Sequence, residues 1–317
     1  MKSFLSFVLL GVLPLFSLPL LGVESKDLAA ADTNALMGTW EQIGVNGAHL
    51  LRFEPQRLIQ LKNGQLRFTR MTYDEGRLVR LGFGGQKEPL DKFEIKDGTL
   101  TLTDLKEQRY SYRRLENNPP ELLIPPLEIG VTESLDATIV NPIQEELSRR
   151  ENASVRVRNE WREYHGKAEQ GDKLKEMEKL DADDSAYLIR TIKAHGWIDR
   201  QRFGPIAENA AYMIVLHSKD LSLMQGTLPE LKKEVLAKQF EPELFAGLCD
   251  RFRTVVALPE RYGTYVLPNQ KGELVIGPLE DSQRVDEFRK EIGLPSLKEY
   301  LKRYQNANGA KEVQVVE

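Results

Sequence analysis

The sequence predicts a two-domain α+β protein, in which an antiparallel β-meander precedes a mainly α-helical domain with a small β-hairpin. Apolar residues alternate from Met37 to Leu115 between short turn sequences, which is typical of antiparallel strands. After a proline-containing stretch, the apolar spacing changes to that of amphipathic helices. About 290 residues follow the N-terminal apolar segment, which is enough for two ordinary domains.

Residues 1–25 are predicted to be a cleaved export signal. Lys2 is followed by an uncharged apolar run that extends to Val23, as in secretory signal peptides. Small residues place the cleavage between Ser25 and Asp32. A retained membrane anchor is the alternative, because the run is about as long as a bilayer span, although two prolines interrupt it. We expect an exported protein of the periplasm, cell envelope or medium, with no membrane span after cleavage.

Residues 37–117 are expected to form the antiparallel β-domain, after a linker at 26–36. Asn63-Gly64 and Asp97-Gly98 are favoured as two-residue hairpin turns. Counting outward from each turn gives pairs whose four apolar side chains point to one face: Leu61 with Leu66 and Ile59 with Phe68, and Ile95 with Leu100 and Phe93 with Leu102.

This domain begins with Met37-Gly38-Thr39-Trp40. A Gly-x-Trp at this place resembles the small lipocalin-like domains of exported bacterial proteins. The resemblance implies a barrel, or a partly open barrel, in which Trp40 closes the floor as a structural residue. A ligand cavity and a filled core both remain open alternatives.

Residues 118–140 contain four prolines and are expected to form a linker. The α-helical domain then spans residues 141–306, and residues 307–317 form a frayed tail. Asn141 is expected to be an N-cap, with Pro142 at the first helical position. Further helices are expected after Asp184, Thr227 and Glu241 and from Asp281 and Ser296. Gly196 is expected to end a helix, and residues 272–277 to form a strand.

Four short motifs follow one another in the helical half: Gly196-Trp197, His217 to Asp220, Tyr262 to Thr264, and Pro278 to Asp281. In this order they resemble a bacterial family known only as a domain of unknown function, over roughly residues 145–304. That family shares a Gly-Trp, a His-x-x-Asp-like element, a Tyr-Gly-Thr-Gln and a Pro-Ile-Glu-Asp. Here the histidine element is one residue longer and Tyr265 replaces the glutamine. The resemblance implies kinship and no activity.

Composition and missing motifs narrow the functional classes. The 44 Lys and Arg residues are interleaved with 48 Asp and Glu residues without a basic stripe, so nucleic acid is not expected as a partner. Cys249 is the only cysteine, so no internal disulfide can form. The sequence has no His-Glu-x-x-His, Gly-x-Ser-x-Gly or phosphate-binding glycine loop. We expect no cofactor and no metal site, because the four histidines are not spaced to share an ion.

Candidate site residues come from the motifs, at predicted helix ends and turns where a scaffold can present side chains. The catalytic candidates are His217, Glu280 and Asp281, and the ligand-binding candidates are Trp197, Tyr262, Thr264 and Arg289. The hypothesis is that His217, Tyr262 and Glu280 line one pocket, with Arg289 available for an anionic group. The structural alternatives are helix capping by His217 and Asp281 and a tight turn at 262–264.

Three functions remain open. The favoured one is a binding protein for an unidentified ligand or protein partner. The second is an envelope hydrolase that uses His217 with Glu280 and Asp281. The third is a carrier of a small apolar ligand through the β-domain.

Overall fold

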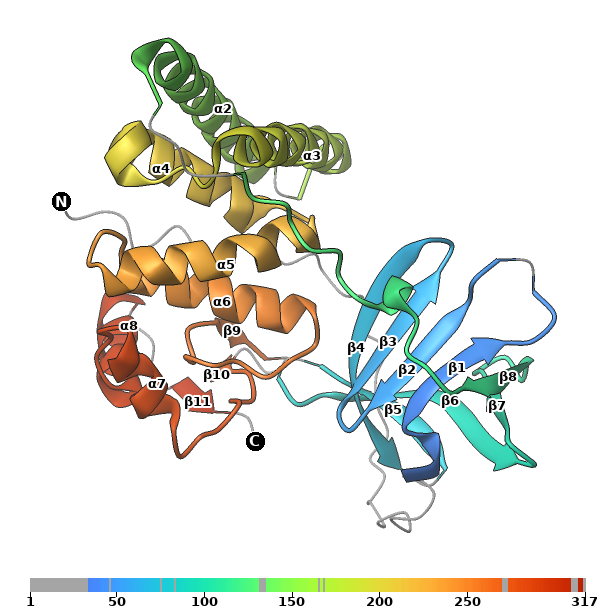
Figure 1. Ribbon diagram of the computed structural model, residues 1–317. Coiled ribbons are helices and arrows are strands. Elements are labelled where there is room, and N and C mark those ends of the chain that lie inside the picture. Colours follow the sequence, from blue (N-terminus) through green and yellow to red (C-terminus); the bar gives the residue numbers. More distant parts are fainter. Residues whose placement is uncertain are drawn as a thin grey trace. The chain divides into compact units, whose positions relative to one another are not determined.

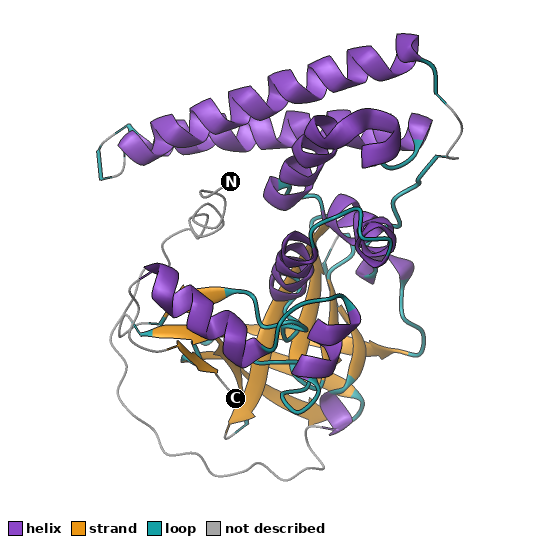
Figure 2. Cartoon of the chain, turned by 90° about the vertical axis from the view of Figure 1, so that its left-hand side faces the viewer, coloured by secondary structure: helices purple, strands orange, loops and turns teal. Residues whose placement is uncertain are grey.

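The computed structural model describes residues 34–45, 47–74, 76–82, 84–130, 135–164, 166–167, 169–269, 273–308 and 313–315 (Figure 1, Figure 2). The predicted export signal, its cleavage site and most of the following linker lie outside these residues. The chain forms two compact units. The first consists of Met1–Leu122, Thr254–Ser282 and Leu297–Glu317, and the second consists of Leu123–Arg253 and Gln283–Ser296. The predicted α+β class is confirmed, but these units interleave along the chain instead of meeting at one boundary near residue 117.

The first unit contains a closed antiparallel barrel (Figure 1). Its strands are β1 (Gly38–Gln42), β2 (Leu50–Glu54), β3 (Arg57–Lys62), β4 (Gln65–Asp74), β5 (Arg77–Leu81), β6 (Lys87–Lys96), β7 (Thr99–Thr103) and β8 (Arg109–Leu115). Each strand pairs with the next along the chain, and β8 pairs with β1. The predicted meander is therefore a barrel whose closure leaves no unpaired edge.

Both predicted hairpins have the expected register and turns with positive φ. Their apolar sets lie on different faces of the barrel. Phe93, Ile95, Leu100 and Leu102 join the interior cluster, which draws residues from strands all around the barrel. The set from the first hairpin instead packs on the outer face with Leu122, from the short helix η1 (Pro120–Leu122).

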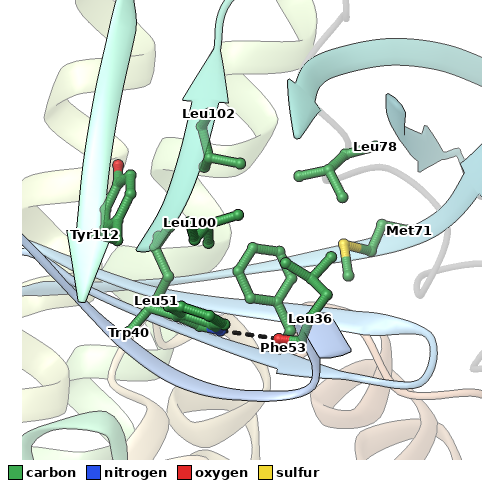
Figure 3. Packing of buried hydrophobic residues seen from close by; sticks show 9 residues of the cluster. All are labelled: Leu36, Trp40, Leu51, Phe53, Met71, Leu78, Leu100, Leu102 and Tyr112. Atoms are coloured by element: carbon green, nitrogen blue, oxygen red, sulfur yellow. Dashed lines mark hydrogen bonds between the residues drawn. The ribbon is translucent and has the colours of Figure 1, made fainter. Parts of the chain in front are cut away.

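Side chains fill the barrel interior around Trp40 (Figure 3). Trp40 is 1% exposed, and its Nε1 atom donates a hydrogen bond of 2.9 Å to the carbonyl of Leu36, a residue just before β1. The guanidinium of Arg114 lies 5.1 Å from the centre of the indole ring. Arg114 also donates to the carbonyl oxygens of Ala35 and Met37. Trp40 thus anchors the segment before the barrel, in the structural role expected for it.

The first unit also contains a three-stranded sheet and helix α8 (Leu297–Asn308). In the sheet, β10 (Leu274–Ile276) pairs with β9 (Val266–Pro268) as the predicted hairpin. On its other side, β10 pairs in parallel with β11 (Val313–Val315). Residues 313–315 were expected to be frayed, but they form a strand because β10 offers a free edge. Arg57 of the barrel donates a hydrogen bond of 3.2 Å to the carbonyl of Val256, within the same unit.

Most of the second unit is helical: α2 (Ala137–Glu163), α3 (Gln170–His195), α4 (Arg200–His217), α5 (Leu221–Leu236), α6 (Pro242–Val255) and α7 (Val285–Glu291). A row of ion pairs joins α2 and α3, which run side by side (Figure 1, Figure 2). The pairs are Arg150–Asp184 at 2.6 Å, Arg158–Asp181 at 2.6 Å and Lys173–Glu160 at 2.7 Å. Among the described residues, no helix combines the length and the apolar character that a membrane span requires.

Some expected helix starts are corrected. Helix α2 begins at Ala137, where the side chain of Asp136 accepts a hydrogen bond from the backbone nitrogen of Thr138, so Pro142 lies inside the helix. Asp184 lies inside α3 because it pairs with buried Arg150 of α2. Thr227 lies inside α5, where its hydroxyl donates to the carbonyl of Leu223.

Other expected boundaries are confirmed. Helix α6 starts at Pro242, directly after Glu241. Gly196 ends α3 with a φ of 79°, in the left-handed region that glycine tolerates. Helix α8 starts at Leu297, next to the expected Ser296.

Candidate functional site

The predicted site residues belong to both compact units. Tyr262, Thr264, Glu280 and Asp281 lie in the first unit, and Trp197, His217 and Arg289 lie in the second. The pocket proposed for His217, Tyr262 and Glu280 thus draws on both units and stays a prediction. Each group is described within its own unit.

In the first unit, a buried carboxylate holds two motifs together. Glu260 is 1% exposed, and its carboxylate accepts hydrogen bonds from the backbone nitrogens of Tyr265, at 3.0 Å, and Gly277, at 3.1 Å. Its backbone also bonds to Pro278 and Glu280, each within 2.8 Å. The segments 260–265 and 277–280 are therefore fixed side by side. Sequence reasoning missed Glu260, since nothing in the spacing of one glutamate marks it as buried.

The other motif residues of this unit make structural contacts. Both carboxylate oxygens of Glu280 accept bonds from Arg261, at 3.0 and 3.1 Å. The carbonyl of Thr264 accepts a bond of 3.1 Å from the Tyr300 hydroxyl. Tyr262 is 1% exposed. The backbone bends at Arg261 and Tyr262, and Gly263 has a φ of 66°, in the left-handed region that glycine tolerates.

Asp281 is not the N-cap that the sequence suggested. Helix α7 begins only at Val285, with Arg284 in the N-cap position and no side-chain capping bond. The three residues between Asp281 and this helix form a turn. The acidic residue therefore lies too far from the first helical turn to cap it.

Trp197 and Arg289, in the second unit, are both buried, at 3% and 0% exposure. The carbonyl of Trp197 accepts a hydrogen bond from Arg202. Arg289 Nε donates a bond of 2.7 Å to the carbonyl of Pro295. In this structure both side chains are therefore packed inside the helical unit.

His217 lies at the end of α4 in a basic environment. Burial, together with the positive charges of Arg158, Arg251 and Arg162, lowers the pKa of the imidazole to about 3. The ring is therefore neutral at physiological pH. Within the part of the chain that the structure describes, it makes no hydrogen bond, so helix capping does not explain its position.

An open cavity of about 300 Å³ lies between α3 and the turn that joins α4 to α5. Its lining residues are Glu178, Asp181, Ala182, Ser185, Ala186, Ile189, Lys219 and Asp220. Hydrogen-bonded Ser185 and Ser218 hold α3 against the turn, with their oxygens 2.8 Å apart. The six residues from α3 recur every three to four positions and so share one helix face. That spacing is visible in the sequence, but it did not identify the face as a cavity wall.

The cavity and the surroundings of His217 meet at Asp181. This carboxylate lines the cavity and forms an ion pair of 2.6 Å with Arg158. Burial raises the pKa of Asp181, and the charges of Arg158, Lys219 and Arg251 oppose that rise. Among the residues described, no group of three or more His, Cys, Asp and Glu side chains is arranged to hold a metal ion.

By its architecture, the chain combines a small antiparallel barrel with a helical unit that carries a charged cavity. It belongs to a family described as "Family of unknown function (DUF6624)", whose model matches residues 141–313. The resemblance inferred from the ordered motifs is thereby confirmed. No curated protein and no solved structure matches the chain.

Proposed function

We propose that this protein is an exported ligand-binding protein whose site is the cavity between α3 and the α4–α5 turn. The observation that supports this most is the composition of the cavity wall. Ala182, Ala186 and Ile189 offer an apolar surface, and charged side chains border it. An apolar surface with a few fixed polar groups is the usual character of a small-molecule site.

The acidic residues at the cavity border are already engaged, which favours binding over catalysis. Asp181 pairs with Arg158, and Glu178 pairs with Lys219 at 2.7 Å. Asp220 accepts a hydrogen bond from the backbone nitrogen of Leu223 and so caps α5. None of them is poised to move a proton in the way that hydrolysis requires.

The protonation state of His217 supports the same choice. An effective general base has a pKa near the working pH. The pKa of His217, lowered to about 3, makes the imidazole a weak base. It can still donate or accept a hydrogen bond as a neutral group.

The barrel gives less support to a carrier of apolar ligands. Trp40, Phe53, Met71 and other large side chains occupy its interior (Figure 3). These contacts are those of a filled core.

Export is the other part of the proposal, and it rests on the uncharged run between Lys2 and Glu24. Protein recovered from outside the cytoplasm should start between Lys26 and Asp32 when its N-terminus is sequenced. Exported material that retains Met1 would favour a membrane anchor instead.

Protein-observed NMR with a library of small fragments tests the cavity. Fragments should shift the methyl signals of Ile189, because this side chain lines the cavity. Ala186→Phe should abolish these shifts by filling the space. Ala194→Phe, at an exposed position on the same helix, is the matched control and should leave them unchanged. Fragments that never reach Ile189, or that bind Ala186→Phe equally well, would contradict the proposed site.

A further inference from the structure

We propose that the helical unit binds an anionic group, a carboxylate or a phosphate, among His217, Arg158, Arg162 and Arg251. This inference rests on the proposed function and identifies the chemical class of its ligand. We call His217 and these three arginines the arginine cluster. They come from α2, α4 and α6, all within the second unit.

The sequence spacing on α2 directs two of these arginines to one side. Arg158, Trp161 and Arg162 lie three and four residues apart and so share a helix face. Both arginines act electrostatically on His217, so this face is turned toward the end of α4. Arg158 is held in place by Asp181 Oδ1 at 2.6 Å and Ser154 Oγ at 2.5 Å.

Arg251 approaches the same place from α6. Its charge acts on Asp181 of α3 and on Tyr212 and His217 of α4. The hydroxyl of Tyr212 donates a hydrogen bond of 3.1 Å to the carbonyl of Leu244, which holds α4 and α6 together. Arg251 therefore lies within electrostatic range of Asp181, Tyr212 and His217, which places it near the C-terminal part of α4.

The charged groups that act most strongly on His217 are all cations. The charges of Arg158, Lys219 and Arg251 all act on Asp181, which forms its ion pair with Arg158. Lys219 pairs with Glu178 instead. Arg158 and Arg251 are partly buried, and neighbouring charges of one sign at such positions are unfavourable unless an opposite charge accompanies them. An anion in the arginine cluster would provide that charge.

Two buried donors point to the same conclusion. The Nε atom of Arg251 and the Nε1 atom of Trp161 are buried and make no hydrogen bond in the described part of the chain. Buried donors are nearly always paired, with protein, water or ligand. A carboxylate or phosphate offers several acceptor oxygens, and hydrogen bonds from guanidinium groups to such oxygens are strong. Water alone could pair the donors but would not compensate the charge.

The cavity supplies room for the rest of such a ligand. Asp181 belongs both to its wall and to the ion pair with Arg158. An anionic group in the arginine cluster would therefore adjoin the apolar surface of Ala182 and Ala186. The ligand class is a small organic acid or phosphate ester with an apolar part.

The test uses inorganic phosphate and acetate as probes, titrated into the full-length mature protein at constant ionic strength with chloride as the balancing anion. The readout is the NMR signal of the His217 ring, assigned with His217→Asn. At least one probe should give a saturable change. Arg251→Met and Arg158→Met should each weaken it about tenfold or more, because a charge-assisted bond is lost. Arg149→Met, at an exposed position of α2 that pairs with Glu146, should leave it unchanged.

Several outcomes would overturn the anion site. One is the absence of a saturable change with either probe while fragments still shift Ile189, which leaves the proposed function standing. Another is an adventitious ion only, seen as equal binding by wild type, Arg251→Met and Arg158→Met. If Arg251→Met does not fold, Arg251→Lys replaces it and should also bind more weakly, since lysine lacks the planar donor fork. Saturable, arginine-dependent binding without any fragment at Ile189 would support the anion site and contradict the cavity.

Discussion

The Oε1 atom of Glu260 accepts a hydrogen bond of 3.1 Å from the backbone nitrogen of Gly277, 17 residues further along the chain. The other carboxylate oxygen accepts one of 3.0 Å from Tyr265. This buried side chain therefore joins the Tyr-Gly-Thr segment to the Pro-Leu-Glu-Asp segment. The two motifs share a structural reason for lying next to each other, whatever they bind.

Glu260→Ala should lower the free energy of unfolding by about 1–3 kcal/mol, because it leaves two backbone donors without their partner. Glu260→Gln should cost less, since its amide oxygen can still accept one of the bonds. Urea unfolding measures both. Glu287→Ala, on the exposed side of α7, is the control. A loss no larger than that of the control would contradict the structural role of Glu260.

Two glycines inside helices should respond to alanine in opposite directions. At Gly226 of α5, an added Cβ would lie 2.4 Å from the Cβ of Leu127, so Gly226→Ala should destabilise the protein by about 1–3 kcal/mol. At Gly247 of α6, nothing lies within 4 Å of the added Cβ. Gly247→Ala should therefore stabilise the protein by about 0.5–1 kcal/mol. Thermal unfolding of both variants checks this, and a Gly226→Ala variant as stable as the wild type would refute the close contact at Leu127.

Trp40→Phe should destabilise the protein by about 1–3 kcal/mol. It removes the donor of the bond to the Leu36 carbonyl, leaves that buried acceptor unpaired and reduces the filling of the core. Denaturant unfolding provides the measurement. Ile43→Ala removes an exposed apolar side chain just after β1 and should cost much less. Equal losses in the two variants would show that Trp40 does not anchor the segment before the barrel.

Glu208 of α4 and Glu234 of α5 should make stability depend on pH. Burial raises the pKa of both carboxyl groups. The negative charge of Glu234 raises the pKa of Glu208 further, and the charges of Asp199 and Glu230 raise that of Glu234 further. The positive charge of Arg200 opposes the rise in the pKa of Glu208, and the charges of Arg202 and Arg200 oppose the rise in the pKa of Glu234. Each group also has a buried carboxylate oxygen without a hydrogen-bond partner in the described structure. The folded protein therefore favours the protonated forms.

The direction of the pH effect follows from these raised pKa values. A raised folded pKa contributes stability that is complete below the ordinary carboxyl pKa and is lost as pH rises through the folded value. Relative to Glu208→Gln and Glu234→Gln, the wild-type protein should thus gain stability between pH 7 and pH 5. Melting temperatures across this range test it, with Glu243→Gln on the exposed side of α6 as the control. Parallel curves for wild type and both variants would exclude the proposed coupling.

Local features of the fold could be predicted from neighbouring residues alone. Asn63-Gly64 and Asp97-Gly98 determine the hairpin turns, because positive φ is easy for these residues. Gly196 and Pro242 mark the end and the start of helices for similar local reasons. The start of α2 was missed because Asp136 offered a better cap than Asn141, one turn earlier.

The candidate site was predictable only in part. His217 was singled out as the end of an apolar helix in a shared motif, and it lies two residues before Lys219, which lines the cavity. Arg158, Arg251 and Asp181 were not found, because charged residues on an amphipathic helix usually face solvent. Their meeting depends on which faces of α2, α3, α4 and α6 pack together.

The sequence by itself determined the alternating and helical periods, the hairpin turns, some of the helix ends and the family of the C-terminal part. The tertiary structure decided which apolar face of the barrel is its interior. A two-residue period says that Ile59 and Phe68 share a face, but not that Leu122 covers that face from outside. It also decided how the chain divides, through contacts such as Arg57 with Val256, 199 residues apart, and which charges act on His217, through the packing of α2, α4 and α6. Contacts of that range depend on the packing of the whole chain and leave no local trace in the sequence.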